Sequence, residues 1–264
     1  MSAVRRILGG FKIKIFKMLN WVFKLFTPYG IYCLYAKKIT LERLVIANQE
    51  HKNGNELNFK ENFANIYEEN FWGSNESRSG PGSELVATKN IRKKLPLLWK
   101  KYGIKSFLDV PCGDFNWMKT INKDGITYIG GDIVEKIVEN NNELYGNESI
   151  SFKVLDITED DLPKVDMILC RDCLCHLSNE NVLKALRNFK KSGAKYLLAT
   201  SYPLTSQNWD INNGDFRPIN LLIEPFNLPH PISKIHNGFI GIPSNYETDK
   251  TEYLFDLKDI GGIL

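Results

Sequence analysis

The 264-residue sequence lacks the features that would make it a membrane-spanning or secreted protein. Lysines interrupt the apolar residues near the N-terminus, where the longest uncharged stretch is LFTPYGIYCLYA at residues 25–36. A membrane span needs about 20 predominantly apolar residues, and a signal peptide needs an uninterrupted apolar core. The five cysteines are odd in number and irregularly spaced, which argues against a secreted disulfide framework. We therefore expect a reducing, cytoplasmic location.

Acidic residues are missing from the first 41 positions. This segment carries eight lysines and arginines, so its charge is +8, and subtraction from the net charge of +3 leaves −5 for residues 42–264. A negatively charged body lacks the broad basic surface that nucleic acids bind. We expect no nucleic-acid partner, and we expect any anionic surface to contact the N-terminal segment.

Residues 7–26 place apolar side chains at three- and four-residue steps, with lysines at other positions. This period predicts an amphipathic helix with a basic polar face inside a segment 1–38. Two interpretations stay open. The apolar stripe packs on the body or on a second protomer in a homodimer, or residues 1–30 lie in the headgroup layer of the inner membrane. In the second interpretation, the cytoplasmic protein is peripheral to that membrane.

Short apolar runs and helical patterns alternate in the body of the chain. The runs are residues 106–110, 126–132, 150–156, 165–170 and 195–201, and helical patterns at 134–146 and 179–193 separate several of them. This order predicts the α/β class, with a Rossmann-like, doubly wound, mostly parallel sheet covered by helices on both faces.

The regions around this sheet complete the predicted organisation. A helical extension covers residues 39–103 and contains a Gly/Ser-rich loop at 71–84, after which a helix with Ser83 as N-cap runs from Glu84 to Gly103. The sheet domain covers residues 104–264, and a lid-like insertion lies at 202–243, since a loop of this length is commonly functional.

The first strand-to-helix turn, LDVPCGDFNWM at residues 108–118, lacks the G-x-G-x-x-G pattern of a dinucleotide site. Gly113 is its only glycine, and Pro111 and Cys112 occupy neighbouring positions, so the turn is poorly suited to a pyrophosphate. This argues against an oxidoreductase that uses NAD.

Three carboxylates, Asp109, Asp132 and Asp156, lie at or near the ends of successive strands. In parallel sheets these ends surround one crevice in which ligands bind. Asp132 is placed to accept both ribose hydroxyls, Asp156 to contact an adenine amino group, and Asp109 to hold the turn through backbone N–H groups. Carboxylates without a phosphate loop favour a nucleoside that carries positive charge.

Four segments, FLDVPCGDFNWM, YIGGDI, FKVLDIT and VDMILCRDCLCHLS, lie in this order over residues 106–178. They resemble the four motifs of the class I S-adenosylmethionine-dependent methyltransferases. The resemblance implies a seven-stranded sheet and S-adenosylmethionine as the cofactor. To the cofactor site we assign residues of these motifs and Arg78, whose guanidinium can bind a carboxylate: Arg78, Asp109, Pro111, Gly113, Asp114, Trp117, Asp132, Ile133, Asp156, Ile157, Cys170 and Arg171.

The segments at 27–35, 71–84 and 209–231 are similar to methyltransferases encoded with bacterial capsule and lipopolysaccharide assembly enzymes. This narrower resemblance implies a small-molecule or glycan acceptor, a sugar nucleotide or a polysaccharide group, methylated on oxygen. Alternatives are methylation of a phosphoramidate or phosphate-type capsule group, and an inactive nucleoside-binding module that recruits partners to the membrane.

A sugar hydroxyl does not ionise unaided at neutral pH, so its methylation needs a base. We assign this role to His176, with Asp172 orienting it or holding the acceptor, because both follow the fourth strand directly. Arg217, Asn220 and His230 of the insertion are candidate acceptor ligands, and His230 is the second candidate base.

The stretch CRDCLCH at residues 170–176 suggests zinc, but ligands so tightly spaced close a tetrahedron only with a distant pair. We expect no metal. Cys170 is expected to act as a small apolar residue, Cys173 and Cys175 to pack inward, and Arg171, Asp172 and His176 to face the crevice.

Overall fold

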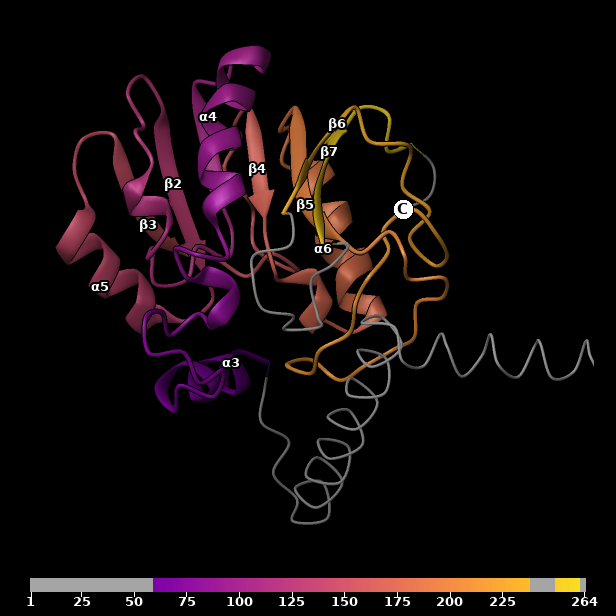
Figure 1. Cartoon of the computed structure of the whole chain (residues 1–264), viewed down its shortest axis with the longest axis horizontal. Coiled ribbons are helices and arrows are strands. Elements are labelled where there is room, and N and C mark those ends of the chain that lie inside the picture. The colour runs from indigo at the N-terminus through magenta and orange to yellow at the C-terminus, as the bar shows by residue number, and fades with distance from the viewer. Residues whose placement is uncertain (1–58, 238–249, 262–264) are drawn as a thin grey trace, which may run out of the picture.

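The computed structural model describes residues 59–237 and 250–261 (Figure 1). The amphipathic helix expected within residues 1–38 lies outside the described residues. Residues 39–58 of the predicted extension lie outside them as well. The first described element is α3 (Phe59–Glu68). No helix in the described ranges is long and apolar enough to cross a membrane.

One seven-stranded sheet with the order β3-β2-β1-β4-β5-β7-β6 forms the centre of the molecule. The first five strands in this order are parallel, and β7 runs antiparallel between β5 and β6. The strands are β1 (Ser106–Asp109), β2 (Thr127–Asp132), β3 (Ile150–Val154), β4 (Met167–Cys170), β5 (Tyr196–Ser201), β6 (Ser233–His236) and β7 (Thr251–Asp256). This confirms the α/β, doubly wound, mostly parallel fold.

Helices cover both faces because alternate side chains of each central strand point to opposite sides. On one face Leu108 and Ile168 pack with α6 (Asn179–Lys191), and on the other Phe107 and Leu169 pack with α4 (Lys89–Tyr102). Figure 1 shows α5 (Glu135–Tyr145) beside β2 and β3 at the sheet edge.

The five apolar runs become the five parallel strands, with ends that differ from the expectation by at most two residues. The Ser178 side chain caps α6, since its Oγ accepts the Asn181 N–H at 3.3 Å. The helix expected from Glu84 is wrong at its start, because α4 begins at Lys89. Residues 84–88 form turns, in which the Leu85 N–H donates to Glu76 Oε1 at 2.7 Å.

Candidate active site

A cavity of about 570 Å³ opens at the carboxyl ends of the parallel strands. It is lined by strand ends, by part of α3 and by residues 78–83, which include the short helix η1 (Pro81–Ser83). Both predicted catalytic residues, Asp172 and His176, line this cavity. Most predicted cofactor-site residues line it as well: Arg78, Asp109, Pro111, Gly113, Trp117, Asp132, Ile133, Asp156, Ile157 and Arg171.

The turn after β1 is closed by Asp132 from β2. Its Oδ2 accepts the Gly113 N–H and its Oδ1 accepts the Val134 N–H, each at 3.0 Å. Gly113 has a φ of +54°, and a Cβ there would lie 2.2 Å from Ser79 Oγ, so the position requires glycine. Burial raises the pKa of Asp132 to about 6. Each carboxylate oxygen has two lone pairs, so Asp132 can accept ribose hydroxyls in addition.

Asp109 lies fully inside the fold, where the Tyr128 hydroxyl donates to its Oδ2 at 2.7 Å. Burial raises the pKa of Asp109 to about 7, against the opposing effect of that hydrogen bond. The expectation that Asp109 holds the turn through backbone N–H groups is corrected. The Gly113 N–H donates to Asp132, which lies on the neighbouring strand.

The ends of β2 and β3 offer an apolar wall made by Ile133, Val134, Leu155 and Ile157. Asp156 stands among them, and its Oδ1 accepts the Thr158 N–H at 2.7 Å and the Thr158 hydroxyl at 2.6 Å. An apolar wall with one fixed carboxylate fits a purine ring that carries an amino group. The cavity therefore has the groups that an adenosyl cofactor needs.

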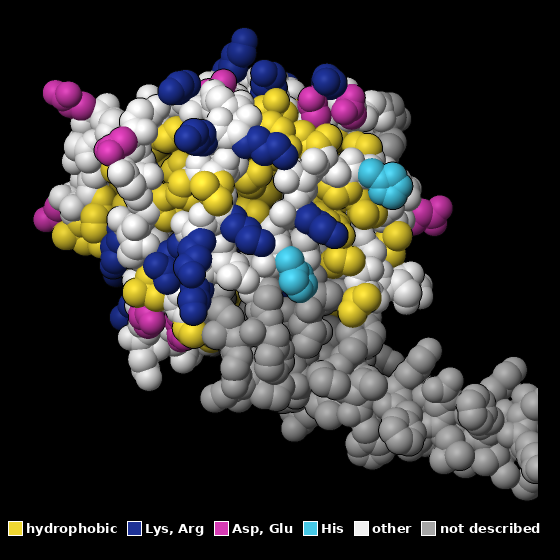
Figure 2. Space-filling view, turned by 45° about the horizontal axis from the view of Figure 1, so that its top comes forward, with side chains coloured by type: hydrophobic (Ala, Val, Ile, Leu, Met, Phe, Trp, Pro, Cys, Tyr) yellow, Lys and Arg dark blue, Asp and Glu magenta, His cyan; other side chains and the backbone are white. Residues whose placement is uncertain are grey.

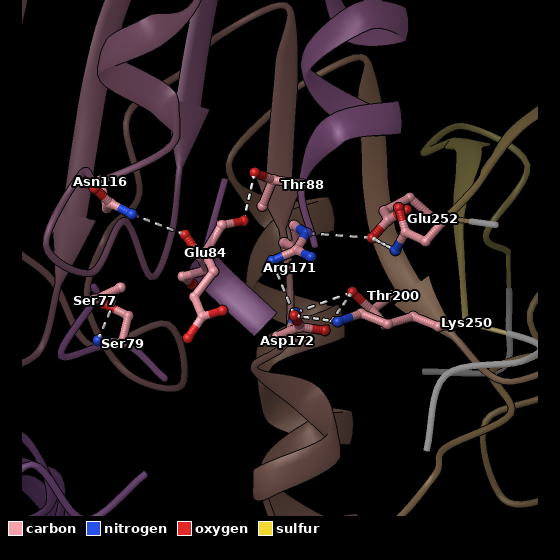
Figure 3. A network of polar contacts seen from close by, with 12 residues as sticks. Ser77, Ser79, Glu84, Thr88, Asn116, Arg171, Asp172, Thr200, Lys250 and Glu252 are labelled. Carbon is pink, nitrogen blue, oxygen red and sulfur yellow. Dashed lines mark hydrogen bonds and ion pairs between the residues drawn. The ribbon is translucent and has the colours of Figure 1, made fainter. Parts of the chain in front are cut away.

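Residues 74–83 are fixed over the β1 turn by Asp114. Its carboxylate accepts the Ser77 hydroxyl at 2.9 Å, the Arg78 N–H at 2.9 Å and the Ser79 hydroxyl at 3.3 Å. Figure 3 shows Ser77 and Ser79 on this segment. Asp114 is not among the residues that line the cavity. Its expected cofactor contact is corrected to a role in holding this segment.

Arg78 lines the cavity at its rim, and its Nη1 donates to the Glu68 carbonyl at 3.0 Å and the Tyr67 carbonyl at 3.3 Å. It thereby joins the segment to the end of α3. Its contact with the cofactor carboxylate stays a prediction.

Arg171, Asp172, Lys250 and Glu252 form an ionic cluster at the base of the cavity (Figure 3). Asp172 Oδ2 lies 2.9 Å from Arg171 Nη1 and 2.5 Å from Lys250 Nζ, and Arg171 Nε lies 3.4 Å from Glu252 Oε1. Burial raises the pKa of Asp172, but the two cations outweigh this effect and hold the pKa below its usual value. Asp172 is therefore ionised at neutral pH and too weakly basic to remove a proton from a hydroxyl.

His176 ends the short helix η3 (Leu174–His176) and lies between aromatic rings. The ring centroids of Trp72 and Phe216 are 4.7 Å and 5.5 Å from that of His176. His176 Nδ1 lies 2.8 Å from the carbonyl oxygen of Asp215, and because a carbonyl only accepts, Nδ1 is the donor. In the neutral ring the basic lone pair is then on Nε2.

The three candidate acceptor ligands of the insertion, Arg217, Asn220 and His230, do not line the cavity. Their predicted contact with the acceptor is therefore corrected. Arg217 is buried and donates to the Leu177 carbonyl and to Asn179 Oδ1, the latter at 2.9 Å. Asn220 is buried and donates to the Thr205 carbonyl at 2.9 Å, while His230 lies exposed. The first two hold the insertion together.

Other residues line the cavity that the sequence patterns did not single out, notably Phe63, Trp72, Tyr202, Phe216 and Lys250. Trp72 and Phe216 belong to the segments 71–84 and 209–231, which resemble methyltransferases of capsule and lipopolysaccharide assembly. The aromatic residues in these segments were the feature from which their place in the cavity could have been predicted. Lys250 had no local signal, because the pairing of β7 with β5 brings it to Asp172.

Among the cysteines of CRDCLCH, Cys170 packs in the core as a small apolar residue, as expected, but Cys173 and Cys175, which we expected to pack inward, both line the cavity. Cys170 is fully buried at the end of β4, outside the cavity lining where we expected it to contact the cofactor, and Cys175 is buried, while Cys173 is half-buried. Burial raises the pKa of Cys112 and Cys175 well above its usual value, and a hydrogen bond with Cys170 together with burial does so for Cys173. Within 59–237 and 250–261, no three His, Cys, Asp or Glu side chains are grouped as metal ligands.

Residues 107–193 match the sequence family described as "Methyltransferase domain". No curated protein matches the sequence. The fold is similar to the 1,6-didemethyltoxoflavin-N1-methyltransferase of Burkholderia thailandensis, solved with bound 1,6-didemethyltoxoflavin and S-adenosylhomocysteine. That match has a TM-score of 0.52 and 14% identity, and covers 74% of this chain and 85% of that one.

The fold is also similar to the magnesium protoporphyrin IX methyltransferase of Synechocystis PCC 6803, solved with bound S-adenosylmethionine. Here the TM-score is 0.50 and the identity 16%, over 75% of this chain and 96% of that one. At these identities the likeness concerns the fold alone.

Proposed function

We propose that this chain, which carries a class I S-adenosylmethionine-dependent methyltransferase domain, methylates a hydroxyl oxygen of a sugar or sugar-linked group. The observation that carries this proposal is the setting of His176. The ring shares one cavity with Asp132 and Asp156, and its Nδ1–H is held by the Asp215 carbonyl, so Nε2 is the basic atom.

The reaction needs two reactants held in line and a proton removed from the acceptor. When bound, the cofactor would supply a methyl group attached to a positively charged sulfur. The rest of the cofactor would leave as a neutral thioether, S-adenosylhomocysteine. His176 Nε2 takes the hydroxyl proton as the new carbon–oxygen bond forms, a contribution typically worth about 10²–10⁴ in rate. The ring stays oriented because Trp72 and Phe216 flank it.

The walls around His176 support a ring-shaped acceptor with hydroxyl groups. Trp72, Tyr202 and Phe216 offer aromatic surfaces, while Asp172 and Lys250 offer an acceptor and a donor of hydrogen bonds. Pockets that combine apolar walls with a few fixed polar groups orient small ligands in this way. A setting in capsule or lipopolysaccharide assembly rests on the resemblance of the segments at 27–35, 71–84 and 209–231.

An anionic acceptor, such as a phosphoramidate or phosphate-type group, is the second candidate. It is favoured by two buried cations in the cavity lining, Arg171 and Lys250. Both are already paired with carboxylates, so an anion there must compete with Asp172 and Glu252. This competition is the reason for ranking the neutral hydroxyl first.

The test is the pair of variants His176→Ala and His230→Ala. We expect His176→Ala to lower turnover 10²-fold or more with S-adenosylmethionine affinity unchanged, and His230→Ala to leave both unchanged, because His230 is exposed outside the cavity. Turnover is followed as S-adenosylhomocysteine release with a panel of nucleotide sugars, and affinity by calorimetry. Near-normal turnover of His176→Ala would show that His176 is not the base.

A further inference from the structure

Helix α4 concentrates the positive charge of the described body. Residues 85–108 contain no acidic residue and seven basic ones, which are Lys89, Arg92, Lys93, Lys94, Lys100, Lys101 and Lys105. Since residues 42–264 together carry −5, removing this stretch of +7 leaves −12 for the rest of the body. The charges of the body are therefore strongly segregated.

The two faces of α4 differ sharply in character. Ile91, Leu95, Leu98 and Trp99 are buried against the sheet. At the middle of the opposite face lies Leu97, whose exposed fraction is 66%.

Four exposed lysines surround Leu97 at the positions i−4, i−3, i+3 and i+4: Lys93, Lys94, Lys100 and Lys101. We call these four lysines and Leu97 the lysine ring. Figure 2 shows Lys and Arg side chains gathered around hydrophobic ones on this side of the molecule.

The fold accounts for this arrangement only in part: Lys100 and Lys101 lie in the last turn of α4, where the helix dipole favours cations, and Lys101 Nζ lies 5.0 Å from the centre of the Tyr102 ring. A solvated helix face usually carries both signs of charge, because i,i+4 pairs of opposite sign stabilise it and like charges repel. Among the described residues, no ion pair involves the four lysines. An anionic partner would therefore remove a repulsion that the isolated protein retains.

The exposed leucine distinguishes between the classes of anionic partner. On a nucleic acid, an aliphatic side chain at the centre of the contact would face phosphates and add nothing to binding. At a bilayer, the lysine stems lie along the surface with their ammonium groups at the lipid phosphates, and the leucine enters the acyl boundary.

We propose that the lysine ring docks this face of α4 onto the surface of an anionic lipid bilayer. The contact would extend toward the cavity through Val86, which is 52% exposed and lies just after the cavity-lining residues 78–83. This surface is separate from residues 1–38, and its role does not depend on which acceptor is methylated.

The test compares two full-length variants that each lose four exposed lysines. The first is Lys93→Ala, Lys94→Ala, Lys100→Ala and Lys101→Ala. The matched control is Lys119→Ala, Lys153→Ala, Lys164→Ala and Lys191→Ala, on other surfaces. Binding to phosphatidylcholine vesicles with and without phosphatidylglycerol is measured by co-sedimentation.

Each lysine near an anionic bilayer contributes to binding, so we expect the first variant to bind phosphatidylglycerol vesicles at least tenfold more weakly than the control. Any contribution of residues 1–38 is common to both proteins and does not affect the comparison. Equal binding by the two variants would overturn the proposal. Unchanged thermal stability and S-adenosylmethionine affinity exclude misfolding as the cause.

A third variant, Leu97→Ser, keeps all the charges and tests insertion. We expect severalfold weaker binding to the same vesicles and unchanged binding to a single-stranded RNA of mixed sequence. If the four-lysine variant loses RNA binding while its vesicle binding stays at the control level, the partner is a nucleic acid and the lipid proposal is wrong. If Leu97→Ser binds vesicles as the native chain does, the leucine does not insert, and the proposal fails on that point.

Discussion

At the residue scale, Asp109 and Asp132 couple the stability of the fold to pH. Both are buried at the carboxyl ends of neighbouring strands, and both have a raised pKa. An aspartate with a raised pKa in the folded state binds protons that the unfolded chain has already released. Stability is therefore lost as pH rises from the unfolded pKa of 3.8 through the folded pKa, which for Asp109 is about 7.

The first prediction concerns Asp109→Asn, which removes this titration but keeps an oxygen to accept the Tyr128 hydroxyl. Relative to the native protein, we expect the free energy of unfolding of the variant to rise by roughly 2–3 kcal/mol between pH 5 and pH 8. Urea denaturation at the two pH values measures this. The control Asp124→Asn, at an exposed site, should show no such pH-dependent gain, and an equal gain in both variants would contradict the assignment.

The residue scale also shows how far local patterns predict a site. Asp172 and His176 reach the cavity because they follow a parallel strand directly, and strand ends are visible in the sequence. The ion-pair partner of Asp172 is not visible in the local sequence, since Lys250 lies 78 residues away. The prediction that Arg217 binds the acceptor is wrong for the same reason. Its buried position depends on the Leu177 carbonyl and the Asn179 side chain, which are distant in the sequence.

At the element scale, residues 74–83 form a cover over the β1 turn, to which Asp114 contributes more hydrogen bonds than Asn116. Asp114 accepts two serine hydroxyls and one backbone N–H of this segment, and Asn116 donates to Glu76 at 2.7 Å. These bonds join stretches of chain that are 35 to 40 residues apart. The segment is thus fixed by side chains rather than by regular secondary structure.

The second prediction is that Asp114→Ala releases this segment. We expect S-adenosylmethionine affinity at least tenfold weaker, because residues 78–83 line the cavity, and faster tryptic cleavage after Arg78. Calorimetry and mass analysis of the fragment that begins at Ser79 provide the two measurements. Glu148→Ala, at an exposed position between α5 and β3, is the control. Native-like affinity together with native-like cleavage would show that Asp114 does not hold the cover.

The elements themselves were predictable where burial follows a simple period. The apolar runs of β4 and β5 are buried almost throughout, as expected for central parallel strands, so their composition alone indicated them. The start of α4 was not predictable, because Glu76 satisfies the Leu85 N–H from another part of the chain. The insertion expected at 202–243 is wrong near its end, because strand β6 (Ser233–His236) lies inside it and pairs with β7 in an antiparallel sense.

At the scale of the whole molecule, the cofactor should stabilise the entire fold, because the cavity joins β1, β2, β4 and residues 78–83. Ligand at 100 times its Kd adds about 2.7 kcal/mol to the free energy of unfolding. The third prediction is that S-adenosylmethionine and S-adenosylhomocysteine raise the Tm by roughly 5–10 °C, since 1 kcal/mol shifts the Tm of a protein of about this size by about 2–4 °C.

Thermal melts with increasing ligand check this prediction, and NAD at the same concentrations is the matched control. NAD should leave the Tm unchanged, because the turn after β1 has one glycine where a pyrophosphate site needs several. A shift with NAD equal to that with S-adenosylhomocysteine would contradict the cofactor assignment.

The raised pKa values of Cys112, Cys173 and Cys175 have a consequence for the chemical resistance of the protein. Peroxides and alkylating agents attack the thiolate, which is scarce at neutral pH when the pKa is high. All three cysteines line the cavity, yet their thiols should react slowly with peroxides at neutral pH. An electrophilic inhibitor aimed at Cys173 would accordingly react slowly at neutral pH, and faster as the pH rises.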